Sequence, residues 1–320
     1  MKKLLIGVFL TVTTYTAFAQ QDPQFTQFFR TRLYYNPAFA GSHNDKDICV
    51  GLIGREQWLG FGSSSKGQTP STYAGDIHAP LFNNRIGVGL NILTDAQGFE
   101  GTLMPTFSFA FHHTFANSSK LSAGVGVGII QKSLDQTKLN ALDKDDKLLT
   151  NELINGNALD LNFGLYYQIP TLSIFDNVYM GLSTAHINQA KVEYGNIKYT
   201  ATRHYYFMAG GVYQLTSDFT LEPNIFVKNA VKTSLDINVM STYQEKLMGG
   251  LTYRNVDAIA LLLGYRILPK TSAMVSYDLT TSRLSQFSNG TVELSVRHCF
   301  GVKYVPREKP VRPIYTPRFL

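Results

Sequence analysis

Alternation between apolar residues and small or polar residues runs through the chain from Asp47 to Phe300. In residues 291–300, TVELSVRHCF, Val292 and Leu294 fall on one face and Glu293 falls on the other. A period of two is that of a β-strand with one apolar and one polar face. We identify about fourteen such segments and predict an all-β fold of antiparallel strands. The predicted strands cover residues 47–56, 70–79, 85–96, 102–115, 119–132, 158–168, 175–187, 203–215, 219–229, 233–243, 245–254, 257–267, 271–280 and 289–300.

The connections between these segments differ in length in a regular way. Every second connection tends to be tight, as in 81–84, whereas several of the others are long, as in 57–69, 132–157 and 189–202. Outer-membrane barrels have short periplasmic turns, long outer loops and, in single bacterial chains, an even number of strands. A large soluble β-sandwich or barrel also alternates, but it does not explain the difference in loop length. We therefore predict a transmembrane outer-membrane β-barrel over residues 47–300, with its apolar side chains facing lipid.

Residues 1–19 have the features of a cleaved secretory signal. Lys2 and Lys3 precede the apolar run LLIGVFL, and Ala17-Phe18-Ala19 forms an A-x-A cleavage site. The run is shorter than the roughly 18 residues of a transmembrane helix, and no later stretch reaches that length. Only 16% of the residues are charged, fewer than the roughly 25% of ordinary soluble domains. We expect the signal to be removed and the mature chain, starting near Gln20, to reach the outer membrane.

The basic charge of the chain is concentrated in its C-terminal tail, residues 301–320. The net charge of +6 falls to +4 without Lys2 and Lys3, and the tail has five basic residues and one acidic residue, so the rest is balanced. This balance and the export signal argue against nucleic-acid binding. Four prolines predict an extended, polyproline-like tail, which either docks a partner or an acidic envelope surface or is disordered. The candidate contact residues of the tail are Arg307, Lys309, Arg312 and Arg318.

The two cysteines of the chain, Cys49 and Cys299, lie near the periplasmic ends of the first and last predicted strands. These two strands are neighbours in a closed barrel, and the periplasm permits disulfides. We therefore expect the pair to be adjacent at the seam where the barrel closes, whether or not the two are bonded. The alternative is that they are two unrelated small residues.

Motifs for catalysis or metal binding are not evident in the sequence. None of the seven histidines lies in G-x-S-x-G, H-E-x-x-H or a metal-ligand spacing. The acidic run 143–146 lacks the glycine and the final glutamate of an EF-hand and is typical of a solvated loop. Residues 124–128, GVGVG, are like a dinucleotide loop only superficially, because glycines on one face of a strand leave space in a lumen. We predict no enzymatic activity, no cofactor and no metal.

The segment that precedes the first strand carries two short motifs. Residues 21–27 read QDPQFTQ, and residues 36–42 read NPAFAGS. This pair resembles the N-terminal signature of the PorP/SprF family, membrane proteins of the type IX secretion system of Bacteroidetes. Further likenesses follow in residues 55–61, REQWLGF, and in residues 316–319, TPRF. The signature residues are Gln21, Asp22, Pro23, Gln24, Phe25, Gln27, Asn36, Pro37, Ala38, Ala40 and Gly41.

The resemblance implies a non-enzymatic outer-membrane barrel that works with the type IX machinery. Some members of the family belong to the core secretion and gliding apparatus, and others accompany a large adhesin that they help to export or to hold at the cell surface. The implied partners are a secreted cargo protein with a type IX C-terminal domain, periplasmic or outer-membrane secretion components, and the lipid bilayer. The alternative is a passive outer-membrane channel or small-solute transporter, because about fourteen strands leave a lumen that conducts unless it is filled.

The signature segment, residues 20–46, is a candidate for a position inside the barrel. Because it precedes the first strand, we expect it to begin on the periplasmic side. We predict that it folds into the barrel mouth as a plug, with its polar side chains bonded to inward-facing groups such as Asp160, Asn162 or Arg297. The alternative is that its motifs specify only a turn and an aromatic girdle.

The first long loop holds the candidate partner contacts of the barrel itself. A tryptophan and a phenylalanine lie there beside glycines and serines, which suits an exposed anchor for another protein. Seating of the same rings at the membrane interface is the alternative. The candidate residues are Trp58, Leu59 and Phe61.

Overall fold

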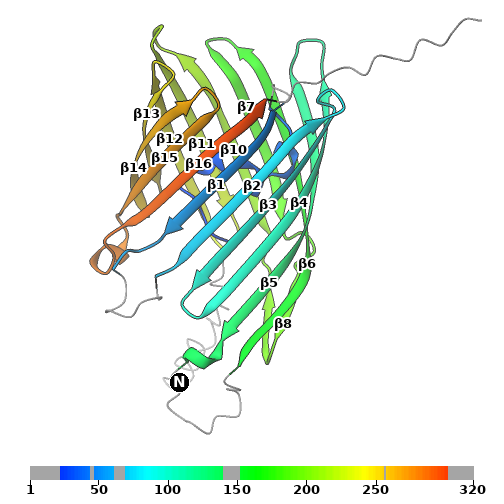
Figure 1. Ribbon diagram of the computed structural model, residues 1–320, viewed down its shortest axis with the longest axis vertical. Coiled ribbons are helices and arrows are strands. Elements are labelled where there is room, and N and C mark those ends of the chain that lie inside the picture. Colours follow the sequence, from blue (N-terminus) through cyan, green and yellow to red (C-terminus); the bar gives the residue numbers. More distant parts are fainter. Residues whose placement is uncertain (1–21, 44–46, 61–68, 140–151, 256, 302–320) are drawn as a thin grey trace, which may run out of the picture.

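Fourteen antiparallel strands form a closed barrel in the computed structural model, which describes residues 22–43, 47–60, 69–139, 152–255 and 257–301 (Figure 1). Each barrel strand corresponds to one predicted segment, and the ends agree to within three residues except in β6. Strand β6 is longer than predicted because its pairing with β5 continues to Leu153. The barrel strands are β1 (Asp47–Glu56), β2 (Ser71–Leu81), β3 (Ile86–Gln97), β4 (Glu100–Thr114), β5 (Lys120–Asp135), β6 (Leu153–Leu172), β7 (Phe175–Ala185), β10 (His204–Gln214), β11 (Phe219–Asn229), β12 (Thr233–Tyr243), β13 (Leu247–Arg254), β14 (Ala258–Leu268), β15 (Thr271–Thr280) and β16 (Thr291–Gly301).

Barrel strands that follow one another in the chain are neighbours in the ring, and the ring closes where β1 pairs with β16. Every barrel strand therefore has a hydrogen-bonded partner on each side. A free sheet edge in a bilayer would leave backbone N–H and C=O groups without partners, at a cost of several kcal/mol for each group. Closure removes that cost.

The connections give the barrel two different ends. At the turn end, at the top of Figure 1, short turns join β2 to β3 and β4 to β5, and here β1 starts and β16 ends. At the loop end, at the bottom, longer connections include residues 186–203 and 281–290. The turn between β2 and β3 is built from three consecutive left-handed residues, Phe82, Asn83 and Asn84. In outer-membrane barrels such short turns face the periplasm.

The outer surface of the barrel is apolar. Leu161, Phe163 and Leu294 point outward and are 36%, 41% and 58% exposed, whereas Glu293 and Ser295 point inward and are buried. Apolar side chains thus face lipid and polar ones face an enclosed interior, which confirms the predicted outer-membrane barrel. Among the described helices, none is both long and apolar enough to cross a bilayer.

A two-stranded hairpin, β8 (Lys191–Tyr194) and β9 (Ile197–Thr200), occupies part of the connection between β7 and β10. This corrects the prediction that residues 189–202 form a loop. The hairpin packs against β6, and its Val192 and Tyr194 are buried there. The sequence did not reveal it, because four-residue strands are too short for alternation to be recognised.

A disulfide bond joins Cys49 of β1 to Cys299 of β16 at the turn end. The two residues are directly opposite each other in the strand register, and their Cα atoms are 4.0 Å apart. The bond spans 250 residues of sequence and therefore links the first barrel strand covalently to the last.

Removal of this bond should weaken the barrel without opening it. In a Cys49→Ser/Cys299→Ser variant the hydrogen bonds between β1 and β16 remain, but the unfolded chain regains the freedom that the cross-link removes. We expect the free energy of unfolding to fall by about 2–5 kcal/mol, as measured by urea unfolding in lipid vesicles. The wild type with reducing agent should behave like the variant, and equal stability of the oxidised wild type and the variant would contradict this account.

Candidate functional site

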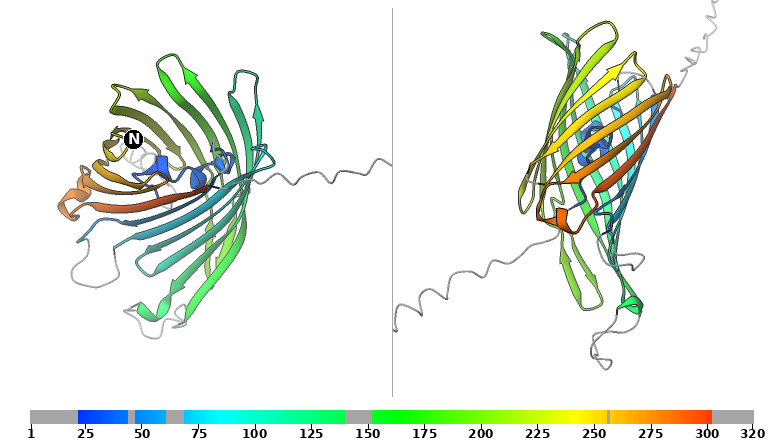
Figure 2. Two further views of the ribbon diagram at one scale, coloured as in Figure 1. Left: turned by 45° about the horizontal axis from the view of Figure 1, so that its top comes forward. Right: turned by 90° about the vertical axis from the view of Figure 1, so that its left-hand side faces the viewer.

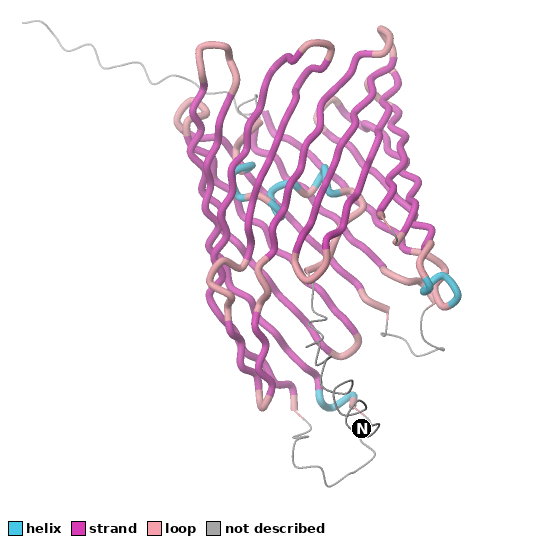
Figure 3. The backbone as a smooth tube through the Cα atoms, turned by 180° about the vertical axis from the view of Figure 1, so that it is seen from behind, coloured by secondary structure: helices cyan, strands magenta, loops and turns pink. Residues whose placement is uncertain are grey.

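The described part of the signature segment, residues 22–43, lies inside the barrel, and we call it the inner segment (Figures 2 and 3). Its apolar side chains are shielded from solvent, with Phe25, Phe28 and Leu33 no more than 2% exposed. Its backbone is folded into three short helical turns rather than a strand. These turns are η1 (Phe28–Arg30), α2 (Arg32–Tyr35) and η2 (Pro37–Phe39).

Asn36 of the second motif links the local turn to the barrel wall. Its side-chain oxygen accepts a hydrogen bond from the N–H of Ala38 (2.9 Å), and Pro37 follows at the first position of the turn. Its side-chain amide donates to the carbonyl oxygens of Leu165 in β6 (2.9 Å) and Leu182 in β7 (3.3 Å). One residue therefore caps η2 and holds it against two strands.

Glycines on the inner face of the wall make room for this motif. A Cβ atom on Gly124 of β5 would lie 2.5 Å from the backbone of Ala38. A Cβ atom on Gly164 of β6 would lie 2.0 Å from the side-chain oxygen of Asn36. Cβ atoms essentially never approach other heavy atoms this closely, so a larger residue at either position would force the motif to shift. The inner segment fills the space that the glycine-rich strand leaves in the lumen.

A buried carboxylate binds the first motif of the signature. Glu293 of β16 is 0% exposed, and its two oxygens accept hydrogen bonds from the backbone N–H groups of Thr26 (2.7 Å) and Gln27 (3.0 Å). Arg55 of β1 forms an ion pair with the same carboxylate. A buried charge needs such partners, because burial removes the water that would solvate it. The inner segment thus replaces part of the solvation that Glu293 has lost.

Further buried charges surround this carboxylate. The hydroxyl of Thr26 donates to Asp278 of β15 (2.6 Å). Arg254 of β13 pairs with Asp236 of β12 (3.0 Å) and lies 3.6 Å from Asp278. The side chain of Gln24 donates to Asp236 (2.9 Å). Because these hydrogen bonds involve ionised groups, they are shorter and more restrictive in geometry than neutral ones, and they fix the first motif in one position.

Aromatic rings fill the middle of the lumen. Tyr35 and Phe28 of the inner segment pack on Phe226 of β11, with ring centroids 4.6 Å and 5.1 Å apart. Toward β7, the guanidinium of Arg32 lies 3.9 Å from the ring centroid of Tyr179 in a cation–π contact. These contacts bury apolar surface inside the barrel and stabilise the inner segment in addition to its hydrogen bonds.

The contacts of the inner segment reach opposite walls. Glu293 belongs to β16, and Ser183, which donates to the carbonyl oxygen of Tyr35 (2.7 Å), belongs to β7. These two strands lie half-way round the ring from each other. Arg30 also donates to the carbonyl oxygen of Ser272 in β15 (3.1 Å). A segment bound on both sides crosses the lumen rather than lining one wall.

Asp22 lies at the loop end in a cluster of charged and titratable groups. Oδ2 of Asp22 is 2.8 Å from Nε2 of His186, which follows β7, and Nδ1 of the same ring is 2.8 Å from Oδ1 of Asp160. The N–H of Asp22 donates to Nε2 of His204 (3.3 Å), and Lys228 donates to its carbonyl oxygen (2.5 Å). Burial alone would lower the pKa of His186, but the two carboxylates outweigh it and raise that pKa to about 10. Burial would likewise raise the pKa of Asp22, yet the neighbouring cations lower it.

The inner segment starts at the loop end of the barrel and not, as predicted, at the periplasmic mouth. Asp22 lies at the loop end beside His186, and Gly41 lies at the turn end, where its N–H donates to Nδ1 of His78 (3.2 Å). The segment therefore runs through the lumen from one end to the other before β1 begins. The prediction placed it near the start of β1 and did not allow for its crossing of the lumen in compact turns.

Of the three wall residues predicted to bind the inner segment, Arg297 binds it, whereas Asp160 and Asn162 bond to another residue. Arg297 donates to the carbonyl oxygen of Arg30 (2.8 Å). Asp160 and Asn162 contact His186 instead of the inner segment. The sequence reasoning missed the charged residues of the wall, although a charge on the inward face of a membrane strand is a signal that could have found them. These residues are Arg55, Asp236, Arg254, Asp278 and Glu293.

The predicted contacts of the first long loop are half-buried at the loop end. The backbone of Leu59 exchanges hydrogen bonds with Asn289 (2.7 Å) and Gly290 (2.8 Å), and the N–H of Trp58 donates to Thr291 (3.1 Å). This part of the loop is therefore held against the connection that precedes β16. The other sequence-predicted residues, which lie outside the described residues, are Gln21, Phe61, Arg307, Lys309, Arg312 and Arg318.

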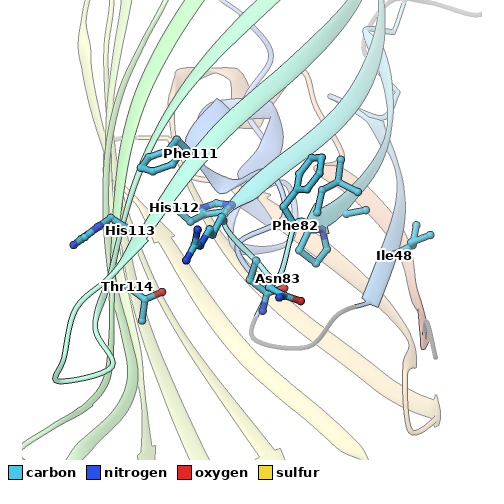
Figure 4. Close-up of a pocket in the computed structure, with 12 residues that line it drawn as sticks. Ile48, Phe82, Asn83, Phe111, His112, His113 and Thr114 are labelled. Carbon is cyan, nitrogen blue, oxygen red and sulfur yellow. The ribbon is translucent and has the colours of Figure 1, made fainter. Parts of the chain in front are cut away.

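A groove of about 1270 Å³ opens at the turn end between β1, the β2–β3 turn and β4 (Figure 4). Its lining includes Phe82, which is 74% exposed, and Phe111 and His112 of β4. Ile48 at its edge pairs with Phe300 of β16, so the groove lies close to the point where the C-terminal tail begins. Exposed aromatic rings around a groove are suited to contact with another protein.

Loss of the anchoring carboxylate should loosen the inner segment. Glu293→Gln keeps the size of the side chain but leaves the buried Arg55 without its charged partner. We expect the free energy of unfolding to fall by about 3–5 kcal/mol in urea and trypsin to cleave the folded barrel faster at Arg30. Glu245→Gln, which removes an exposed pair with Arg266, is the control and should cost about 0–1 kcal/mol. Equal digestion of the two variants would show that Glu293 does not hold the segment.

The sequence matches the family model described as "Type IX secretion system membrane protein PorP/SprF" over residues 17–298. Among solved structures, the CymD monoaromatic hydrocarbon channel is similar with a TM-score of 0.53 and 11% identity, over 86% of this chain and 94% of that one. A FadL homologue from Pseudomonas aeruginosa has a TM-score of 0.48 and 10% identity, over 84% of this chain and 94% of that one. No curated protein matches the sequence. At such low identity the likeness to CymD shows the fold alone.

The matched residues include both signature motifs and nearly the whole barrel. The fold, with apolar residues outside and a polar lumen, is that of an outer-membrane protein. Sequence match and fold agree with the resemblance that the signature motifs carry. The chain belongs to the PorP/SprF family of type IX secretion system membrane proteins.

Proposed function

We propose that this protein is a non-conducting barrel that helps to export a cargo protein, such as a large gliding or surface adhesin, or holds it at the cell surface. In this role it connects the cargo to periplasmic secretion components and performs no catalysis. The observation that carries the proposal is the inner segment, whose contacts on β16 and β7 bridge opposite walls of the lumen. A lumen occupied in this way leaves the two ends of the barrel, rather than its interior, as the working surfaces.

The two ends suit different partners. With the short turns in the periplasm, the turn-end groove around Phe82 faces the secretion components. The basic tail, residues 301–320, starts beside that groove and adds charged contacts to the same partner. The loop end, with the β8–β9 hairpin and the loop that contains Trp58, faces the exterior and the cargo, which carries a type IX C-terminal domain. Residues 1–19 act as the cleaved signal that brings the chain to the envelope.

A passive channel is the second candidate. CymD, whose fold is similar, is a monoaromatic hydrocarbon channel. A barrel of this size encloses a lumen that can carry a small solute when it is empty. The inner segment argues against this role here, because its aromatic rings and ion pairs occupy the centre of that lumen.

Conductance in a planar bilayer separates the two candidates. We expect the wild type to be silent and Gly124→Leu to conduct, because the new side chain takes the place of Ala38 and displaces the inner segment. Gly249→Leu is the matched control, since a Cβ atom there has no neighbour within 4 Å, and it should stay silent. Steady conductance of the wild type would contradict the adaptor role and favour the channel.

Secretion in cells tests the role directly. We expect deletion of the gene to remove proteins with a type IX C-terminal domain from the cell surface, because the barrel connects them to the secretion machinery. An inventory of surface and secreted proteins by mass spectrometry measures this loss, and restoration with Gly249→Leu is the control. Loss of many such proteins means a core component, and loss of one large adhesin means a dedicated partner. An unchanged inventory would overturn the proposed function.

A further inference from the structure

Two histidines and an aspartate converge at the loop end, where the inner segment begins. Asp22, His186 and His204 each present one possible ligand atom, and these atoms lie within 4.8 Å of one another. The three side chains are shielded from solvent, with exposed fractions of 10%, 4% and 2%. They come from the inner segment, from the connection after β7 and from the start of β10, so the fold assembles the cluster from three separate parts of the chain.

The hydrogen bonds of the two rings fit metal ligation. Nδ1 of His186 is 2.8 Å from the carboxylate of Asp160, and Nδ1 of His204 is 2.8 Å from the carbonyl oxygen of Thr202. In metal sites a ligating histidine bonds its other ring nitrogen to a carboxylate or a carbonyl group, which fixes the ring and its tautomer. Nε2 of His186 faces the carboxylate of Asp22 (2.8 Å), whereas Nε2 of His204 accepts a hydrogen bond from the backbone N–H of Asp22 (3.3 Å), a bond that an ion at this nitrogen would replace.

The charges around the cluster suit a cation. Lys228 donates to the backbone carbonyl oxygen of Asp22, so that the carboxylate of Asp22 faces His186 rather than Lys228. Tyr206 donates to one oxygen of that carboxylate (3.3 Å) and helps to orient it. The carboxylates of Asp22 and Asp160 lie on either side of the His186 ring, each 2.8 Å from one of its nitrogens, so two acidic groups face this position.

We propose that Asp22, His186 and His204 bind a divalent transition-metal ion, with Zn²⁺ as the best match. Zinc takes histidine nitrogen and carboxylate oxygen in tetrahedral sites at about 2.0–2.1 Å, so its ligand atoms lie roughly 3.3 Å apart. Nε2 of His186 and Oδ2 of Asp22, at 2.8 Å, are already close to this spacing. A water molecule completes the four ligands. On binding, the ion takes the place of the proton between His186 and Asp22, which is released to solvent, and of the hydrogen bond from the N–H of Asp22 to His204. The proposal departs from the prediction made from the sequence, which was that the chain has no metal site.

The ion fixes the first described residue of the inner segment to the wall that lies opposite Glu293. The site rests on these side chains alone and is independent of the role in secretion. The other histidine cluster does not offer the same chemistry. His78 accepts from Gly41 at Nδ1 and contacts Arg297 at Nε2, and His43 lies beside sulfur atoms that are already bonded to each other.

Zinc titration of the purified barrel tests the proposal. The full mature chain, made without a polyhistidine tag and stripped with EDTA in detergent, is titrated with zinc chloride in a calorimeter. We expect about one ion per chain, at least a tenfold loss of affinity in His204→Gln and Asp22→Asn, and a loss of roughly 10–100-fold in Asp160→Asn. His113→Gln, which changes an exposed histidine at the turn end, should bind as the wild type does.

The folding of each variant is followed separately by the gel mobility of unheated samples. X-ray absorption of the zinc-loaded wild type should show imidazole and oxygen ligands and no sulfur. If the variants do not fold, this spectrum is the test of the proposal. A wild type that takes up no zinc would overturn the proposal. A folded His204→Gln variant with wild-type affinity, or a spectrum without imidazole ligands, would do the same.

Discussion

A sheet that spans a bilayer must close on itself, because lipid offers no hydrogen-bond partners for the N–H and C=O groups of a free edge. In this protein closure joins β1 to β16, the first and last strands of the barrel. Residues from the two ends of the sequence therefore meet at one seam. Arg55 pairs there with Glu293, and Cys49 is bonded to Cys299. The seam carries the disulfide and the main anchor of the inner segment for the same topological reason.

Closure also creates an interior in which buried charges need partners. The wall presents such charges on some strands and bare glycine faces on others. The inner segment contacts both kinds of surface. The N–H groups of Thr26 and Gln27 donate hydrogen bonds to the buried charge of Glu293, and Ala38 packs in the space beside Gly124. Two features of the wall that look unrelated in the sequence are therefore two halves of one binding surface, and the signature motifs are their complement.

The barrel could be predicted from the sequence, because a strand with lipid on one side and a polar lumen on the other must alternate. The path of the inner segment could not, since Thr26 binds Glu293, which is 267 positions away, and no local pattern encodes that contact. The histidine cluster was hidden for the same reason. His186 and His204 have no metal-ligand spacing in the sequence, and they meet only because β7 pairs with β10.

The distance in sequence between Thr26 and its anchor has a consequence for biogenesis. Thr26 is synthesised before any strand of the barrel, whereas Glu293 belongs to the last one. The contact between the inner segment and Glu293 therefore cannot form until the final barrel strand is present. A product that ends before β16 lacks Glu293 and leaves the N–H groups of Thr26 and Gln27 without the carboxylate that binds them, so full anchoring of the inner segment requires the last barrel strand.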